Sequence, residues 1–330
     1  MSKYSTKYEC KDNGGLASIA IACVFIVFAV VMMSFIHVWR STGGDKSDSL
    51  GLEDVTYDIM EFFSEEKPRP TSKIAIACLM RKPIDLHEWF KHHINIGISH
   101  FFIRVEDSGS LGEYLSTQKN VTVEIGDSDT TGNNYHTLQY RQRDYVNKCI
   151  KDCQKMGIEW LFHIDADELL NGSLAFLDNL DKGFKCVRLQ NAEAVFKENE
   201  SSCFSALKFM KCGKGAPCRS YVNGKGGGRI AEGVALMGPH HFGFNGEIHG
   251  KSVYEVPFEK LHVLHFDSCS FGAWVEKFNH LSKKKQENIP FPYYNESINA
   301  AVKGYEVYKR FNMSSLDGID PELVYQRADV

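Results

Sequence analysis

The chain has 330 residues, 43% of them hydrophobic, and a formal net charge of −4. This length suits one large domain or two small ones, and the composition is that of a globular protein with an apolar core. The mild acidity lacks the basic footprint that nucleic-acid-binding proteins carry, so we expect no nucleic-acid partner.

The N-terminal part contains one apolar run, residues 16–38, which is about 23 residues long. A run of this length spans a hydrocarbon layer of roughly 30 Å, whereas the apolar region of a cleaved signal peptide has about 7–15 residues. Residues 32–36 offer no convincing cleavage site. We therefore expect an uncleaved transmembrane signal-anchor and not a buried helix of a soluble domain. Residues 39–71, which contain Pro68-Arg69-Pro70, are typical of a stem.

The distribution of charge indicates the orientation of this span. Three lysines precede it, and basic residues favour the cytoplasmic side of a membrane. We therefore expect residues 1–15 to be a cytoplasmic tail and the bulk of the chain to be lumenal, as in a single-pass type II membrane protein. The ER, the Golgi and a viral membrane all suit such a span. Five glycosylation sequons agree with a lumenal glycoprotein, and they begin at Asn120, Asn171, Asn199, Asn295 and Asn312.

Eight cysteines follow the predicted span, an even number that permits disulfides in a lumenal domain. Cys212 and Cys218 are the favoured pair, because they close a small loop that contains glycine and proline. Cys78, Cys149 and Cys153 lie on apolar faces of predicted elements, so plain core thiols are the alternative for them.

Four short apolar segments in the first half have the length and flanking turns of buried strands: 73–79, 100–105, 121–125 and 160–164. After the first of them, Asp85 and Glu88 have the spacing of a capping box and open a helix that Gly97 ends. A longer helix is predicted over 137–156, closed by Gly157. This repeating order predicts a mostly parallel sheet with helices on both faces.

The signals beyond residue 181 are mixed. Short strands are predicted near 185–190 and 205–210, and another over 261–266. A Gly-rich loop is expected at 224–228 and helices after Phe271.

The fourth predicted strand runs directly into three acids, Asp165, Asp167 and Glu168. Open α/β sheets bind ligands beyond the carboxyl ends of their strands, and carboxylates placed there hold hard cations such as Mg²⁺ or Mn²⁺. The spacing alone is a weak signal, because Asp165 could cap a helix and Glu168 could be a surface acid. A calcium EF-hand loop is excluded, because Leu169 and Leu170 stand where an oxygen ligand and a glycine are needed.

Several residues follow one another in a distinctive order: Ile76-Ala77-Cys78, His87-Glu88-Trp89-Phe90, His93, Gly97, His100-Phe101-Phe102-Ile103, Asp107-Ser108, Gln139, Tyr145, Glu159-Trp160 and Ile164-Asp165-Ala166-Asp167-Glu168. This order, over roughly residues 73–285, resembles glycosyltransferases of the GT-A fold, similar to families 2 and 92. The resemblance implies an α/β GT-A-like catalytic domain at 72–330, with a nucleotide-sugar half at 72–180 and an acceptor half at 181–330. The family's usual Asn-Glu after the first strand is here Arg81-Lys82.

The resemblance also implies roles for individual residues. In such folds the Asp-x-Asp motif binds the cation that bridges the diphosphate of a nucleotide sugar, which places Asp165 at the ribose or the metal and makes Asp167 a direct ligand. Asp107 would contact the nucleoside, and a plain turn residue is the alternative. The third metal ligand is expected to be a histidine of the second half. His265 is favoured because it ends a strand pattern, and His240 is second, although a lone histidine is more often structural.

The remaining candidates would serve the phosphates and the acceptor. Lys225 and Arg229 belong to the predicted Gly-rich loop, which could close over phosphates or be a mobile surface loop. An inverting transferase needs a carboxylate base for the acceptor hydroxyl. Asp267, Glu232 and Glu247 are candidates for this base, and a retaining mechanism stays open.

These observations predict a transferase that moves a sugar from a nucleotide sugar, a UDP-sugar by preference, to a hydroxyl of a glycan or glycoconjugate with Mn²⁺ or Mg²⁺. A non-catalytic, membrane-anchored carbohydrate-binding ectodomain on the same fold is the alternative, because fold does not prove activity. A zinc-stabilised adhesion module that uses Cys212, Cys218 and the histidines is a third reading, although five intervening residues are long for a zinc knuckle.

Overall fold

The computed structural model describes residues 69–128, 134–196, 203–213, 218, 223–283, 292–300, 304–312 and 320–327. All of them belong to one compact unit, residues 64–330. The predicted tail, the predicted membrane span and the predicted stem up to residue 68 lie outside the described residues. Among the residues that are described, no helix has the length and apolar character needed to cross a membrane.

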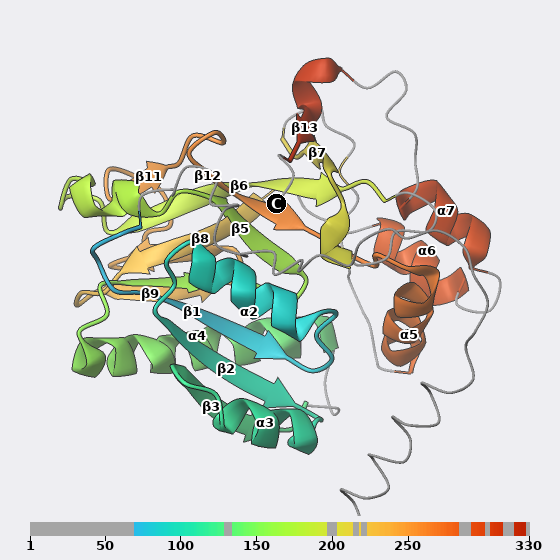
Figure 1. Ribbon diagram of the computed structural model, residues 1–330, viewed down its shortest axis with the longest axis horizontal. Helices are drawn as coiled ribbons and strands as arrows, with labels where there is room; N and C mark the ends of the chain where they lie inside the picture. The colour runs from blue at the N-terminus through green and yellow to red at the C-terminus, as the bar shows by residue number, and fades with distance from the viewer. Residues whose placement is uncertain are drawn as a thin grey trace, which may run out of the picture. The chain divides into compact units, whose positions relative to one another are not determined.

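The fold is α/β and is built on a large mixed sheet (Figure 1). Four parallel strands lie in the order β4-β1-β2-β3: β1 (Ile74–Met80), β2 (His100–Glu106), β3 (Val121–Gly126) and β4 (Trp160–His163). The helices that connect them are α2 (Leu86–Asn95), α3 (Gly109–Ser116) and α4 (Asn134–Met156). The four strands and the two longer helices predicted from the sequence are confirmed, and α3 is an additional helix that was not predicted.

Side chains that alternate along the strands build two separate apolar layers. In β1, Ile76 packs into the cluster that contains Trp89 of α2, whereas Ala75 and Ala77 pack into the cluster that contains Val146 of α4. Successive side chains of a strand point to opposite faces, so one strand supplies both clusters. The helices α2 and α4 therefore cover opposite faces of the parallel strands (Figure 1).

Both long helices end as their sequences indicate. The Asp85 carboxylate accepts a hydrogen bond from the backbone N–H of Glu88 at 3.2 Å and so caps the start of α2. Gly97 follows α2 with a φ of +105°, and Gly157 follows α4 with a φ of +65°. Glycine has no steric penalty in this region, which is why it terminates both helices.

The second half of the sheet contains a strand where a loop was predicted. β8 (Asn223–Arg229) lies antiparallel between β4 and β6 (Cys186–Ala194). The prediction of a Gly-rich loop at 224–228 is therefore wrong. The glycines permit close packing, because a Cβ on Gly227 would lie 2.7 Å from the ring of Phe162. Phe162 belongs to β4, which is distant from β8 in sequence. The local composition therefore gave no sign of this packing and indicated a flexible loop.

The other strands extend and brace this sheet: β5 (Glu168–Gly172), β7 (Lys208–Lys211), β11 (Val253–Glu255), β12 (Leu261–His265) and β13 (Val324–Gln326). β12 pairs antiparallel with β5 and parallel with β6. β9 (Val234–Gly238) and β10 (His241–Phe244) form a separate hairpin. Short 3₁₀ turns occur at Ala175–Asn179, Cys203–Ser205 and Pro321–Leu323. The strands predicted near 185–190, 205–210 and 261–266 are confirmed.

The C-terminal helices pack around a core of their own, on one side of the sheet in Figure 1. They are α5 (Phe271–Ser282), α6 (Pro292–Ala300) and α7 (Tyr305–Asn312). Their buried aromatic residues are Trp274, Phe278, Tyr293 and Tyr308. The predicted helices after Phe271 are thus confirmed.

Two disulfides are present among the described residues. The predicted Cys212–Cys218 bond is confirmed, with a Cα–Cα distance of 5.7 Å. A second bond joins Cys203 to Cys269, whose Cα atoms are 5.1 Å apart. The cysteines expected as core thiols are free and buried, as is Cys186. Burial raises the pKa of Cys186 to about 12, so this thiol is protonated and unreactive at neutral pH.

Replacing Gly224 with Ala is expected to destabilise the protein by about 2 kcal/mol, the typical cost of overpacking a core. A Cβ at this position would lie 2.1 Å from the carbonyl oxygen of Leu189, and backbone cannot move aside cheaply. Urea denaturation measures the difference. Gly238→Ala is the matched control, because no atom lies within 4 Å of its added Cβ. Equal stability of the two variants would contradict the packing role of the β8 glycines.

Candidate active site

The acidic run lies where the chain leaves β4 and turns into β5. Asp165 and Asp167 follow β4, and Glu168 is the first residue of β5. The backbone N–H of Asp165 donates to the Glu168 carboxylate at 2.7 Å, and the Glu168 N–H donates to the Asp165 carbonyl at 3.2 Å. Because β1, β2 and β4 are parallel, their carboxyl ends meet at this same edge.

Asp165 is held from two elements. One carboxylate oxygen accepts from the Lys225 ammonium of β8 at 2.5 Å, and the other accepts from the Gln142 amide of α4 at 2.8 Å. The Lys225 nitrogen is also 3.5 Å from the Glu168 carboxylate. The side chain of Lys225 is only 1% exposed. The lysine that was expected to contact phosphate from a loop is therefore an internal partner of Asp165.

Mutual attraction influences the protonation of Lys225, Asp165 and Glu168. Burial lowers the pKa of Lys225, but Asp165 and Glu168 outweigh burial, so the net pKa of Lys225 is raised. Burial raises the pKa of Asp165, and the Lys225 charge outweighs that effect, so the net pKa is lowered. For Glu168 burial prevails, and its pKa is raised in spite of Lys225. Lys225 and Asp165 are therefore both charged at neutral pH.

Two histidines beside this ion pair are neutral at neutral pH. Burial, and secondly the Lys225 charge, lower the pKa of His163 to about 4. The same two causes lower the pKa of His240 to about 3. The His240 Nδ1 lies 2.9 Å from the Gly224 carbonyl oxygen, so this nitrogen donates to backbone. The structure thus brings His240 next to Lys225, with one ring nitrogen committed to β8.

Asp167 lies in a different environment from Asp165. Its carboxylate Oδ2 is 3.9 Å from His265 Nε2 and 3.9 Å from Lys277 Nζ, and its side chain is 24% exposed. Lys277, from α5, also donates to Asp267 at 2.5 Å. The backbone N–H of Phe266 donates to the Asp167 carbonyl at 2.8 Å, which ties β12 to this turn. The predicted residues Asp167, His265 and Asp267 are thus brought together.

Asp167 and His265 lie close enough together for their ligand atoms to share one cation. Two ligand atoms that each lie about 2.1 Å from one ion are at most about 4 Å apart, which the Asp167 to His265 distance satisfies. Mg²⁺ keeps several waters and is usually bound through one or two carboxylates plus substrate phosphates. Asp165 is already engaged by Lys225 and Gln142, so Asp167 is the better direct ligand.

A zinc module is not supported by the cysteines. In the part of the chain that the structure describes, one group of three metal-ligand types converges, namely Glu193, Cys212 and Cys218. The two sulfurs are joined in a disulfide, whereas zinc binds thiolates.

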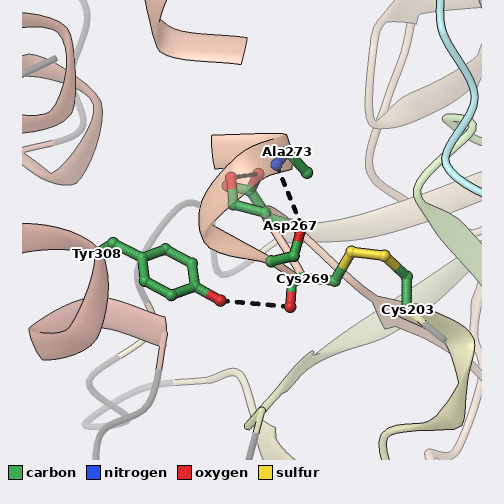
Figure 2. The surroundings of a disulfide bond; sticks show 7 residues. Cys203, Asp267, Cys269, Ala273 and Tyr308 are labelled. Carbon is green, nitrogen blue, oxygen red and sulfur yellow. Dashed lines mark hydrogen bonds between the residues drawn. A yellow bond between two sulfur atoms is a disulfide. The ribbon is translucent and has the colours of Figure 1, made fainter. Parts of the chain in front are cut away.

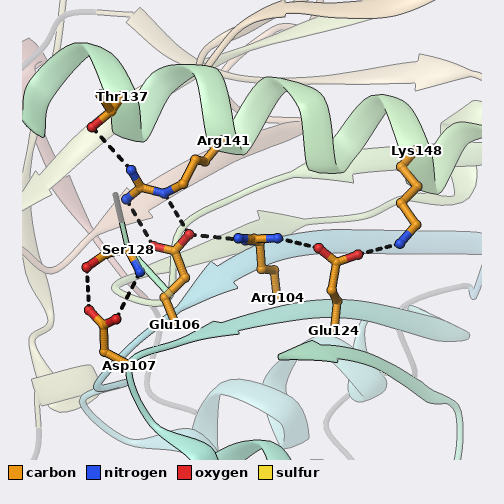
Figure 3. Close-up of polar contacts among 8 residues, drawn as sticks. All are labelled: Arg104, Glu106, Asp107, Glu124, Ser128, Thr137, Arg141 and Lys148. Carbon is orange, nitrogen blue, oxygen red and sulfur yellow. Dashed lines mark hydrogen bonds and ion pairs between the residues drawn. The ribbon is translucent and has the colours of Figure 1, made fainter. Parts of the chain in front are cut away.

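Asp107 lies at the same sheet edge, directly after β2, with a φ of +55°. Its carboxylate accepts from the Ser128 N–H at 2.9 Å and from the Ser128 hydroxyl at 2.5 Å (Figure 3). Asp107 therefore fixes the chain after β3, which is the turn role that was the alternative. A contact with a nucleoside stays a prediction.

The neighbouring Glu106 is buried and anchors a network of charges (Figure 3). Its two carboxylate oxygens accept from Arg141 of α4 at 2.7 and 3.0 Å, and Arg104 donates to it at 3.1 Å. Arg141 is followed directly by Gln142, which holds Asp165. One turn of α4 therefore fixes the ends of both β2 and β4.

Three other candidates lie away from this edge. Arg229 pairs with Trp160 at the start of β4 and stacks over its ring at 4.9 Å. Arg229 lies four positions further along β8 than Lys225, which places their backbones about 13 Å apart. Glu232 and Glu247 are exposed in turns at the far end of β8 and of the β9-β10 hairpin. The structure does not bring these three residues to the acidic run.

No protein-family model matches this chain, and no curated protein does. The geometry must therefore carry the functional argument. Two residues of the site were missed by sequence reasoning, Gln142 and Lys277. Each lies on a helix and shows its role only through contact with an acid of another element, so local sequence held no signal for either.

Proposed function

We propose that the chain is a GT-A-like glycosyltransferase that transfers a sugar from a nucleotide sugar, preferably a UDP-sugar, to a hydroxyl of a glycan or glycoconjugate. One observation carries the proposal. Asp165 and Asp167 follow β4, Asp107 follows β2 at the same edge, and His265 of β12 faces Asp167. This is the edge at which open α/β sheets bind nucleotides.

The environment of each residue indicates the role that it would have in this reaction. Asp167 and His265 would hold Mn²⁺ or Mg²⁺, which when bound neutralises the charge that develops on the departing diphosphate. Asp165, fixed by Lys225 and Gln142, would hold the turn that presents Asp167 and face the ribose. Lys277 supplies a cation beside Asp167, where phosphate oxygens would lie. Asp267 is the candidate base that lies nearest, because Lys277 also contacts it.

The location proposed for this activity is the lumenal face of an ER, Golgi or viral membrane, with the chain anchored through residues 16–38. The apolar length of that run supports an anchor. The two disulfides support an oxidising compartment.

A panel of nucleotide sugars, incubated with the full chain and Mn²⁺, tests the proposal. We expect slow metal-dependent release of the nucleotide from one donor, faster release when a glycan acceptor is added, and loss of both with EDTA. Release of free nucleotide is measured by a coupled assay. No release from any donor, with or without acceptors, would contradict the proposal.

A carbohydrate-binding ectodomain without catalysis is the second candidate. The observation that favours it is the Lys225–Asp165 ion pair, since an internal ammonium already neutralises one acid of the motif. Such a protein would bind a glycan in calorimetry and release no nucleotide in the same panel.

A further inference from the structure

We propose that the Cys203–Cys269 disulfide positions the acidic segment that faces Asp167, so that Cys203 and Cys269 are positioning residues of the candidate active site. This inference rests on the proposed function for its effect on activity. It concerns residues 266–270, which connect β12 of the sheet to α5 of the C-terminal helices.

The segment carries chemistry in a conformation that needs support. Asp267 is 2% exposed and bonds to Lys277. The next residue, Ser268, has a φ of +56°, a left-handed conformation that is unfavourable for a residue other than glycine. Its hydroxyl donates to the Asp267 carboxylate at 2.9 Å. The orientation of the Asp267 carboxylate therefore depends on the left-handed backbone of Ser268.

Three contacts fix the end of this segment, as Figure 2 shows. Cys269 is bonded to Cys203, and its carbonyl accepts from the Tyr308 hydroxyl at 3.3 Å. The Ser270 hydroxyl accepts from the Ala273 N–H at 3.1 Å and caps α5. The disulfide is the covalent one of the three, and it joins points 66 residues apart in sequence.

The other end of the disulfide is a firm anchor. Phe204, next to Cys203, packs edge-on against Phe266 with ring centroids 4.9 Å apart. The Phe204 carbonyl accepts from the Arg327 guanidinium at 2.9 Å. Arg327 directly follows β13, an edge strand of the main sheet. The disulfide therefore ties the segment to the sheet and not to a free loop.

Removing the bond should loosen the acidic segment without unfolding the sheet. A dithiol reductant cleaves it by attack of one thiolate on a cysteine sulfur, followed by closure of the reductant to a cyclic disulfide. The two electrons and two protons of the reductant then reside on the two cysteine thiols. Ser268 would lose the disulfide restraint on the adjacent Cys269, and Asp267 and Lys277 would be held less firmly beside Asp167.

The test compares two double variants of the full chain, Cys203→Ser with Cys269→Ser, and Cys212→Ser with Cys218→Ser as the matched control. We expect amide hydrogen exchange at residues 266–277 to rise at least tenfold in the first pair and to stay unchanged in the control. Exchange in β1 should stay unchanged in both. The kcat of sugar transfer should fall about tenfold in the first pair and stay unchanged in the control. Reoxidation of reduced wild-type protein with oxidised glutathione should restore both values.

Each alternative outcome overturns the proposal. Unchanged exchange at 266–277 would mean that the disulfide does not hold the segment. Faster exchange in β1 as well would mean that it serves overall stability. Altered exchange with an unchanged kcat would mean that the segment does not serve catalysis. If wild-type protein releases no nucleotide from any donor, the proposed function fails, while the exchange measurements still decide whether the disulfide holds this segment.

Discussion

Replacing Asp167 with Asn is expected to lower Mn²⁺-dependent release of nucleotide from the donor about 100-fold or more. The substitution removes the charge that would bind the cation, and losing one group that stabilises developing charge typically costs about 10²–10³ in rate. The fold should tolerate the change, because the Asp167 side chain is partly exposed and its neighbours His265 and Lys277 are 3.9 Å away. Steady-state kinetics and a thermal melt of the same sample measure both quantities.

The control for this variant is Asp144→Asn. Asp144 is an exposed acid of α4 that pairs with its neighbour Arg143, so kinetics and Tm should match the wild type. Wild-type rates for Asp167→Asn at saturating Mn²⁺ would remove Asp167 from the metal site. A lowered Tm together with lost activity would assign it a structural role instead.

Replacing Lys225 with Met is expected to destabilise the protein by about 3 kcal/mol at neutral pH. Breaking one partner from a buried ion pair typically costs about 3–5 kcal/mol, because the remaining charges are left without compensation. Here the carboxylates of Asp165 and Glu168 would both lose their cationic partner. Lys148→Met is the matched control, since Lys148 pairs with Glu124 at an exposed site and such pairs contribute about 0–1 kcal/mol.

The destabilisation by Lys225→Met should depend on pH with a defined sign. In the wild type the pKa of Asp165 is lowered, so its stabilising effect is present above the pKa of the unfolded chain and is lost as the pH falls through the lower folded value. Without Lys225 the largest effect that lowers both pKa values is lost, and the burial that raises them from the unfolded values near 4 remains. The folded variant then loses stability as the pH rises through that range. Urea denaturation at about pH 4.5 and 7 should show a smaller deficit at the lower pH, and an equal deficit would contradict the ion-pair explanation.

The Cys203–Cys269 disulfide and the Lys225–Asp165 ion pair support different parts of the same site. Lys225 and Gln142 fix Asp165 from β8 and α4. The Cys203–Cys269 bond fixes the segment that brings Asp267 and Lys277 toward Asp167. The variants at these positions therefore separate two effects, loss of overall stability for Lys225 and local loosening for the disulfide.

The sequence by itself determined the parallel half of the fold. The apolar run of β1, the Asp85 cap, and the glycines at 97 and 157 are short-range signals, because each acts on neighbours within a turn or a strand. The position of Asp165 and Asp167 after a buried strand followed from the same local pattern. These features could be predicted since the physics that produces them is contained in a few consecutive residues.

Only the tertiary structure decided how the site is assembled. The run around Lys225 has the composition of a flexible loop, yet it is a central strand because its glycines leave room for the rings of Phe162 and Phe242 and for the backbone of β6. His265 approaches Asp167 because β12 pairs with β5 and β6. Lys277 approaches Asp167 and Asp267 because of the way α5 packs. Such long-range contacts are selected by burial of the whole core and by compensation of buried charge, and no local pattern encodes either.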